Sequence, residues 1–307
     1  PIECGEDGKR MRVMVLGASG MLGHVVATLL EEKGYEVVSV SRRGSFGHLP
    51  EAVDLEDWPT LRFHIEKHRP EWIVNAAGLL NDEVDRHAAS AILVNSFLPR
   101  MLADVGPEMG FRLITVGSDC VFQGDRGGYS VIDVPDAHSA YGKSKHLGEV
   151  NNKRDLTIRT SIVGPEIDLA GRGLLQWFMS QEPDADGWIS AVWTGVTTLE
   201  LAKVIEGVVS GECQETGLWH CVPAAPITKF DLLKLMNEFF RESTIKVNEV
   251  PGLPHDRSLI NDRPAAWRVP DYLDMLSELQ EWVLEHQNLY QGTAFEIVLK
   301  RDDLENL

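Results

Sequence analysis

The chain has 307 residues, of which 43% are hydrophobic and 25% are charged. That composition is ordinary for a globular protein and argues against long disorder, collagen and coiled coil. Its 29 basic and 47 acidic residues give a net charge of −18, so we expect no nucleic-acid partner. The sequence contains no run of about 18 apolar residues, so we also expect no membrane span and no membrane partner.

Cysteine usage and the N-terminal residues indicate a cytoplasmic protein. Cys4, Cys120, Cys213 and Cys221 form no CxxC pair, which favours free thiols in a reducing compartment. Residues 1–10 are polar and lack the apolar segment of a secretory signal. We interpret them as an extension outside the fold, either native or left over from expression. We predict no metal site, because the ten histidines form no HExxH motif.

In chain order, the apolar patterns predict strands that alternate with helices. Such alternation indicates an α/β fold, a doubly wound parallel sheet of Rossmann type with helices on both faces. The predicted strands are 12–16, 35–40, 72–75, 111–116 and 156–159. The predicted helices are 24–32, 61–68, 88–105, 139–151, 198–209, 228–240 and 272–289.

Beyond residue 161 the alternation loosens, and Gly, Trp and Pro become frequent. We therefore predict a dinucleotide-binding domain over 11–165, which a returning segment near 195–222 rejoins. The segments 166–194 and 223–300 are predicted to form a smaller C-terminal α/β part that binds the substrate.

The first predicted strand is followed by GxxGxxG, with Gly17, Gly20 and Gly23 at the fixed places. Glycines permit a tight turn and close backbone approach to a pyrophosphate, and the next helix offers its free N–H groups. A plain turn is the alternative interpretation. The position between strand and helix favours the cofactor, with contacts at Gly17, Gly20 and their neighbours Ser19, Met21 and Leu22.

The end of the second strand indicates the type of cofactor. Ser41 is followed by Arg42 and Arg43, with no acidic residue nearby. Basic residues there suit the 2′-phosphate of NADP, whereas NAD would need an acid, so we expect NADPH and regard NADH as less favoured. Two solvated arginines are the alternative. Asp54 and Leu55 form a weaker candidate for the adenine edge.

A catalytic group is predicted where Tyr141 and Lys145 share one helix face, four residues apart. A nearby ammonium lowers the pKa of a phenol and makes it a usable acid or base. Ser118, just after the strand 111–116, can hold a carbonyl oxygen. YxxxK alone is a common accident on a solvated helix, but here it accompanies the glycine turn and Asn75-Ala76-Ala77-Gly78 after another strand.

These motifs resemble the extended short-chain dehydrogenase/reductase superfamily. Within it, segment 117–149, with GSDCVF and YGKSKHLGE, is similar to the dTDP-4-dehydrorhamnose reductase family, which shows S-T-D-Y-V-F-D-G and Y-G-x-[ST]-K-x-x-G-E. RTS at 159–161 and GVT at 195–197 agree with that family's R-T-S and G-x-P-T. The resemblance covers most of residues 11–290.

The resemblance implies reduction of the 4-keto group of a nucleotide-linked 4-keto-6-deoxy sugar by NADPH, in polysaccharide biosynthesis. Tyr141 would protonate the carbonyl oxygen, Ser118 would hydrogen-bond it, and Lys145 would hold the nicotinamide ribose and lower the Tyr141 pKa. Asp119, Cys120, Arg172 and Trp193 join Ser118 as expected substrate contacts, and Arg159, Arg257 and Arg263 are further candidates for the substrate diphosphate.

Departures from the family pattern keep alternatives open. Cys120 stands where the family has Tyr, Val196 replaces a proline, and Gly78-Leu79-Leu80 differs from the usual segment. Another nucleotide-linked sugar is therefore equally open as substrate. A nucleotide-sugar epimerase or a non-catalytic NADP-binding regulatory subunit remains possible on this scaffold. We expect a monomer or a homodimer.

Overall fold

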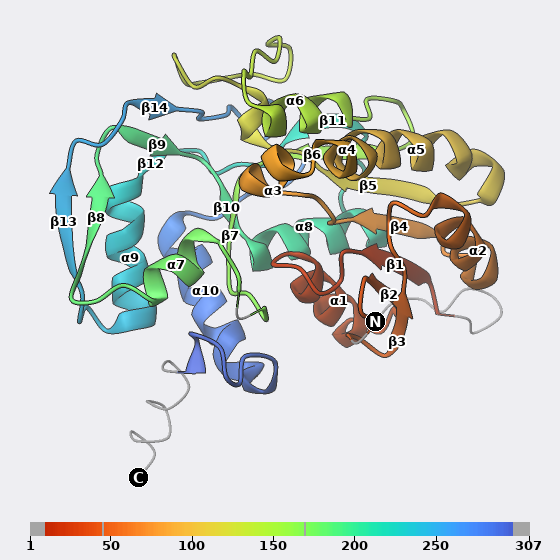
Figure 1. Ribbon diagram of the computed structural model, residues 1–307, viewed down its shortest axis with the longest axis horizontal. Coiled ribbons are helices and arrows are strands. Elements are labelled where there is room, and N and C mark those ends of the chain that lie inside the picture. Colours follow the sequence, from red (N-terminus) through yellow and green to blue (C-terminus); the bar gives the residue numbers. More distant parts are fainter. Residues whose placement is uncertain (1–9, 45, 169, 297–307) are drawn as a thin grey trace.

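A parallel sheet forms the centre of the molecule, a computed structural model that describes residues 10–44, 46–168 and 170–296. Across the sheet, the strands lie in the order β11–β6–β5–β4–β1–β2–β3, and every pairing is parallel (Figure 1). The seven strands are β1 (Arg12–Leu16), β2 (Glu36–Ser41), β3 (Leu49–Ala52), β4 (Trp72–Asn75), β5 (Arg112–Val116), β6 (Leu156–Arg159) and β11 (Gly217–His220). The predicted α/β, Rossmann-type fold is confirmed.

Both faces of the sheet are buried, because successive side chains of each strand point to opposite faces. Along β1, Val13 and Val15 join one hydrophobic cluster, whereas Met14 and Leu16 join another. The first cluster lies under α1 (Gly23–Glu32), α8 (Thr198–Ser210) and α10 (Tyr272–Glu285). The second lies under α2 (Trp58–His68) and α5 (Leu98–Met109).

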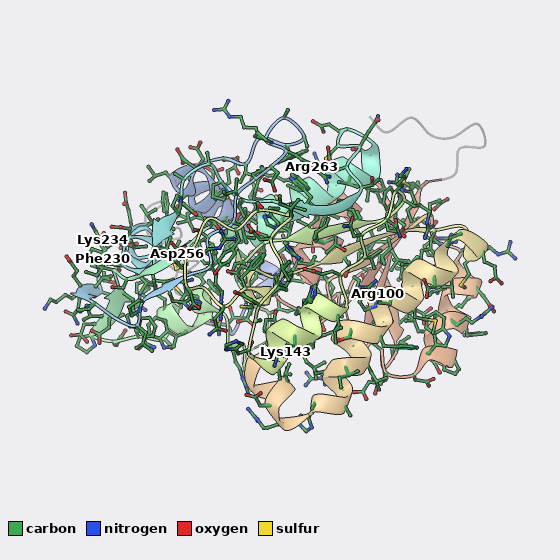
Figure 2. All side chains as sticks on the ribbon, turned by 90° about the horizontal axis from the view of Figure 1, so that it is seen from above. Arg100, Lys143, Phe230, Lys234, Asp256 and Arg263 are labelled. Carbon is green, nitrogen blue, oxygen red and sulfur yellow. The ribbon has the colours of Figure 1, made fainter. Side chains whose placement is uncertain are left out.

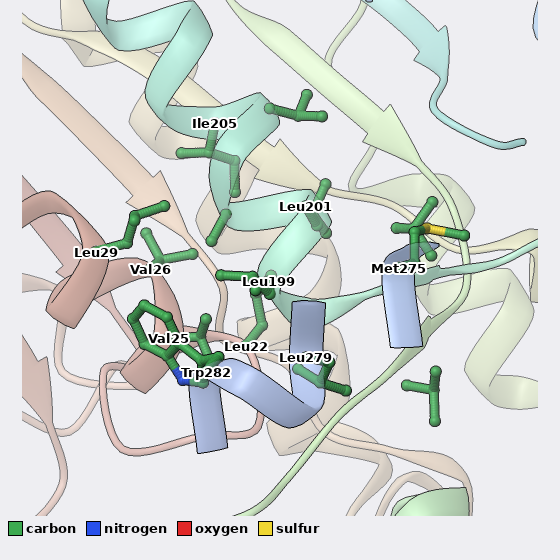
Figure 3. Close-up of a cluster of buried hydrophobic side chains, with 14 of the residues drawn as sticks. Leu22, Val25, Val26, Leu29, Leu199, Leu201, Ile205, Met275, Leu279 and Trp282 are labelled. Carbon is green, nitrogen blue, oxygen red and sulfur yellow. The ribbon is translucent and has the colours of Figure 1, made fainter. Parts of the chain in front are cut away.

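Helix α1 is fixed by C-terminal helices far away in the sequence. Figure 3 shows Val25 and Val26 of α1 in one cluster with Leu199 of α8 and Trp282 of α10. The helix that follows the glycine turn is therefore packed by residues from the second half of the chain.

Short helices lie beside α5, above the sheet in Figure 1. They are α3 (Asn81–Arg86), α4 (Ala88–Ala91), the π-helical η1 (Ile92–Phe97) and α6 (Ala140–Leu147), with the 3₁₀ turn η2 (Asp119–Val121) next to α6. The predicted helix 88–105 is thus interrupted by a π-helical stretch, and the predicted helix 139–151 ends four residues early.

Most of the remaining elements form a smaller part at the left of Figure 1. β8 (Asp184–Trp188) pairs with β13 (Lys246–Val250), and β9 (Ala191–Trp193) lies between β12 (Ile227–Thr228) and β14 (His255–Asp256). β7 (Ile162–Val163) pairs with β10 (Val196–Thr197), and both lie between this smaller part and the large sheet. The helical elements are α7 (Leu174–Met179), α9 (Lys229–Arg241) and η3 (Gln287–Leu289).

Some of the predicted segments lie partly outside the residues that the structure describes. Residues 1–9 of the predicted N-terminal extension, which include Cys4, lie outside the described residues, as do residues 297–300 of the predicted substrate-binding part. Among the described helices, none has the length and apolar character needed to cross a bilayer.

Candidate active site

The strand order changes direction between β1 and β4, and we call the region outside the carboxyl ends of these two strands the crevice. From β1 the chain continues to β2 and β3 on one side, and from β4 to β5 and β6 on the other. Loops leaving the carboxyl ends of two strands at such a point diverge, and ligands of doubly wound sheets bind between them. The glycine turn after β1 and residues 75–78 after β4 flank this crevice.

The glycine turn is as tight as its sequence predicts. Gly17 has a φ of +76°, and a Cβ there would lie 2.9 Å from the Cα of Ala77. A Cβ on Gly23 would lie 2.0 Å from the Gly17 carbonyl oxygen, so only glycine lets α1 begin against the turn. Ser19 and Gly20 are exposed at the tip, Met21 is half-buried, and Leu22 has its side chain in the core.

The loop after β4 is held beside the glycine turn by backbone and amide contacts. The Ala76 N–H donates to the Leu16 carbonyl (3.1 Å), and the buried Asn75 side chain donates to Thr115 Oγ1 of β5 (3.3 Å). A small pocket at this edge is lined by Asn75, Ala77 and Asn95, and also by Thr115, Gly117 and Lys145.

Arg42 and Arg43 follow β2 directly and are exposed. Neither forms an ion pair with a residue of the described ranges, so both guanidinium groups are available to a ligand. The neighbouring turn after β3 contains Asp54, which is exposed and accepts from the Glu56 N–H (3.0 Å), and Leu55, which packs on the core beneath α2.

Helix α6 is positioned by its cap and by one glycine. The Ser139 side chain caps the helix by accepting from the Gly142 N–H (3.1 Å). A Cβ on Gly142 would lie 2.1 Å from the Cys120 carbonyl oxygen. Gly142 therefore allows α6 to lie against the η2 turn, and this close packing brings Tyr141 to Ser118.

Burial controls the proton affinity of Tyr141. It raises the pKa of the phenol well above its ordinary value of 10.0, and the nearby Cys120 and Asp119 act in the same direction. A side-chain hydrogen bond with Ser118 opposes this shift. The phenol consequently keeps its proton at neutral pH, and burial by itself makes it a weaker acid than a solvent-exposed tyrosine.

Lys145 lies one turn further along the same face of α6. Its ammonium donates to the Val116 carbonyl at the end of β5 (2.7 Å), and burial lowers its pKa to about 8. Glu149 opposes that decrease. Since Lys145 is not among the groups that shift the Tyr141 pKa here, the expected lowering of that pKa by Lys145 stays a prediction.

Asn95 lines the same small pocket and was not among the site residues predicted from the sequence. Its side-chain oxygen accepts from the Leu79 N–H (2.9 Å), and its amide donates to the Leu79 carbonyl and to Ser144 Oγ (both 3.0 Å). It thus ties the loop after β4 to the helix that carries Tyr141. A buried amide inside an apolar helical pattern was the available signal, and π-helical turns such as η1 often mark functional sites.

Basic groups gather around η2. Arg257 Nη1 lies 3.2 Å from Cys120 Sγ, and the Lys229 ammonium lies 4.7 Å from the centre of the Trp193 ring. Burial lowers the pKa of Lys229 to about 8, and Asp119 opposes that shift. Burial also raises the pKa of the Cys120 thiol to about 12, so this cysteine is no reactive thiolate.

The other candidate residues occupy different places. Arg159 is 2% exposed and paired with Glu149 through two hydrogen bonds, so it is a structural residue and not a diphosphate ligand. Arg263 pairs with Glu215 and lies well apart from Lys143 of α6 in Figure 2. Trp193 is 4% exposed, with its ring against Tyr272.

Arg172 lies in a segment that packs on the glycine turn. It precedes Gly173, where an added Cβ would meet the Met21 side chain at 2.2 Å. The Gly173 N–H donates to Glu166 Oε2 (2.7 Å), which fixes the segment. Arg172 therefore lies beside the predicted cofactor turn.

Comparison with known proteins identifies the family. The model of the RmlD substrate binding domain matches residues 11–266. The chain belongs to this family. The resemblance seen in the sequence is thereby confirmed, and the family assignment covers the sheet, the glycine turn and the Tyr141 helix together.

Relatives of two kinds are similar to this RmlD-family chain. A dTDP-4-keto-6-deoxy-D-glucose reductase of Streptomyces niveus is 28% identical over 253 residues, which are 78% of this chain and 83% of the relative. Methionine adenosyltransferase 2 subunit beta of Bos taurus is 30% identical over 162 residues, 51% of this chain and 48% of the relative.

Solved structures share the fold over nearly their whole length. A hypothetical dTDP-4-dehydrorhamnose reductase from Sulfolobus tokodaii is 27% identical with a TM-score of 0.73, covering 85% of this chain and 96% of that one. A dTDP-4-dehydrorhamnose reductase from Bacillus anthracis in complex with NADP has a TM-score of 0.74 at 19% identity, covering 88% and 99%.

Proposed function

We propose that this protein is an NADPH-dependent reductase of the 4-keto group of a nucleotide-linked 4-keto-6-deoxy sugar. The observation that carries the proposal is the side-chain hydrogen bond between Tyr141 and Ser118, with Lys145 one turn further along α6 and hydrogen-bonded to the end of β5. Family membership and the reductase names of relatives support the same reaction.

The crevice fits a dinucleotide. Gly17 and Gly20 allow a tight turn whose backbone a pyrophosphate would approach, with Ser19, Met21 and Leu22 completing the turn. The exposed Arg42 and Arg43 would hold a 2′-phosphate, and Asp54 and Leu55 would border the adenine. The segment Asn75-Ala76-Ala77-Gly78 and Lys145 would hold the nicotinamide ribose. When bound, the cofactor supplies the hydride.

The chain's own residues provide alignment and the proton. Ser118 donates a hydrogen bond to the carbonyl oxygen at C4, and Tyr141 transfers its phenolic proton to the same oxygen as charge develops there. The phenol is protonated at neutral pH and can act as an acid, but burial makes it a weaker one, so the proposed transfer requires the Lys145 ammonium to lower its pKa. We propose that Asp119, Cys120 and the basic Arg257 and Lys229 line the sugar side.

Arg42 and Arg43 are proposed to select NADPH over NADH. The variant Arg42→Ala/Arg43→Ala should weaken NADPH binding at least about tenfold, because two charge-assisted contacts to a phosphate are lost. NADH binding should change little. Fluorescence titration measures both, and Arg62→Ala, on the exposed face of α2, is the control. Equal weakening for both dinucleotides would contradict the assignment.

A turnover assay tests the reaction. NADPH oxidation is followed with a panel of nucleotide-linked 4-keto-6-deoxy sugars, and the proposal predicts stoichiometric oxidation with at least one of them. Sugar conversion without net NADPH consumption would indicate an epimerase instead. Binding of NADPH with no conversion of any sugar would favour the regulatory alternative, to which the likeness to methionine adenosyltransferase 2 subunit beta points.

A further inference from the structure

Two histidines and a carboxylate meet at the outer edge of the sheet, away from the catalytic groups. Glu51 lies on the edge strand β3, in register with Val40 of β2. His64 and His68 lie one turn apart on α2. This pair has HxxxH spacing, so the lack of an HExxH motif does not exclude a metal site.

The three side chains converge closely. Glu51 Oε2 lies 3.2 Å from His64 Nδ1, and Glu51 Oε1 lies 2.6 Å from His68 Nε2. One ligand atom from each of the three residues lies within 4.8 Å of the others. Ligand atoms at about 2.0–2.2 Å from a tetrahedral ion are roughly 3.3 Å apart, so a small movement suffices to close the site.

His64 Nδ1 is a buried polar atom whose hydrogen bonding is unsatisfied. It faces Glu51 but makes no hydrogen bond of normal geometry within the described residues. Buried polar atoms are rarely left unsatisfied without a reason. Imidazole nitrogen and carboxylate oxygen are the ligands that zinc and its neighbours in the first transition row accept.

Lys67 would compete with a metal ion for the Glu51 carboxylate. Its ammonium lies 2.6 Å from Glu51 Oε1, and its side chain is 48% exposed. A half-exposed lysine of this kind contributes little to stability and can turn to water. Each histidine side chain, by contrast, is only 13% exposed and is fixed on the helix.

We propose that Glu51, His64 and His68 bind one Zn²⁺ or similar divalent transition-metal ion, with water in the remaining coordination position. The bound ion joins the edge strand β3 to α2. Because β3 is an edge strand and three of its four residues are exposed, such a link stabilises the part of the sheet that has least packing.

The test uses the full-length, untagged and metal-free chain with Zn²⁺ as the probe. Calorimetric titration should show one ion per chain, and saturation should raise the melting temperature. His64→Ala and His68→Ala should each lower the affinity at least about tenfold and remove the thermal shift, since each deletes a ligand. His48→Ala, an exposed histidine near β3, should leave both unchanged.

Co²⁺ offers a second readout that does not depend on stability. The wild-type chain should show visible absorption bands on Co²⁺ binding, and His68→Ala should lack them. The proposal is overturned if no stoichiometric binding occurs, in which case the cluster is only a set of ion pairs. It is equally overturned if binding persists in both histidine variants, which would assign the ion to other groups such as the cysteines.

Discussion

The residues around Tyr141 determine the pKa of its phenol. Burial, together with Asp119 and Cys120, raises the pKa of the phenol, whereas Ser118 opposes that shift by hydrogen bonding. The proton therefore stays on the phenolic oxygen at neutral pH. Burial alone also makes the phenol a weaker acid, so the proposed proton transfer depends on the Lys145 ammonium lowering this pKa.

Tyr141→Phe should remove the acid and spare the cofactor site. We expect kcat to fall about a hundredfold to ten-thousandfold, the usual contribution of a general acid, while the Kd for NADPH stays the same. Steady-state turnover and fluorescence titration measure the two quantities. Tyr35→Phe serves as the control, because the Tyr35 hydroxyl donates to Glu206 far from the site. Full turnover by Tyr141→Phe would show that another group supplies the proton.

At the scale of elements, the approach of α6 to η2 decides whether Tyr141 reaches Ser118. Gly142→Ala would place a Cβ 2.1 Å from the Cys120 carbonyl oxygen and 2.6 Å from Ala137 Cβ. Alanine normally favours a helix, so any loss of stability reports the clash. We expect a loss of about 1–3 kcal/mol in the free energy of unfolding, as in other overpacked sites, and a strongly reduced kcat.

Gly34→Ala is the matched control for that variant. Gly34 has a φ of +92° and no atom within 4 Å of an added Cβ, so alanine there meets strain without a clash. It should cost roughly 1–2 kcal/mol of stability and leave kcat unchanged. Chemical denaturation measures the stability of both variants. An unchanged kcat in Gly142→Ala would mean that α6 tolerates displacement.

Elements with a clear apolar pattern were predictable, and those held by tertiary contacts were not. The strand bounds 12–16, 72–75 and 156–159 match β1, β4 and β6, because each is buried on both faces and reads as an apolar run. β3 (LPEA) is largely exposed and has no such run. Periodicity also cannot reveal the π-helical register of η1, which directs Asn95 toward Leu79.

The same limit applies to the site. Ser118, Tyr141 and Lys145 could be named from spacing, because strand ends and a shared helix face bring them to one place. The burial of Arg159 could not be predicted from spacing, because its partner Glu149 lies ten residues away and the pairing depends on how α6 meets β6. The convergence of Arg257 on Cys120 joins residues 137 apart in the chain.

Across the whole molecule, a chain of hydrogen bonds links the glycine turn to the C-terminal segment. Trp282 Nε1 donates to the Tyr290 hydroxyl (3.2 Å), which lies 2.9 Å from His24 Nε2. His24 Nδ1 lies 2.8 Å from the Gly20 carbonyl, which fits a proton on Nδ1. The turn is thus held by residues more than 250 positions away, in keeping with the shared core of α1, α8 and α10.

This link makes stability depend on pH. Burial lowers the pKa of His24 from 6.5 to about 4. Between these values the unfolded chain binds a proton that the native chain does not, so the free energy of unfolding falls as the pH falls from 6.5 to 4. We expect a loss of about 2 kcal/mol from His24 by pH 5.

Urea denaturation at pH 7 and pH 5 measures that loss. His220, whose pKa is also lowered to about 4, adds to it, so His24→Gln should reduce the pH dependence without removing it. His138→Gln changes an exposed histidine and should leave the dependence unaltered. An unchanged dependence in His24→Gln would show that His24 is not the group responsible.

The proposed reduction is tested most directly by following the hydrogen itself. The protein is supplied with NADPH carrying deuterium at C4 of the nicotinamide and with a nucleotide-linked 4-keto-6-deoxy sugar, and the product is examined by NMR and mass spectrometry. The account predicts one deuterium at C4 of the sugar for each NADPH oxidised, and almost none with Tyr141→Phe. A sugar that is recovered unlabelled, or that is converted while the NADPH remains reduced, would contradict it.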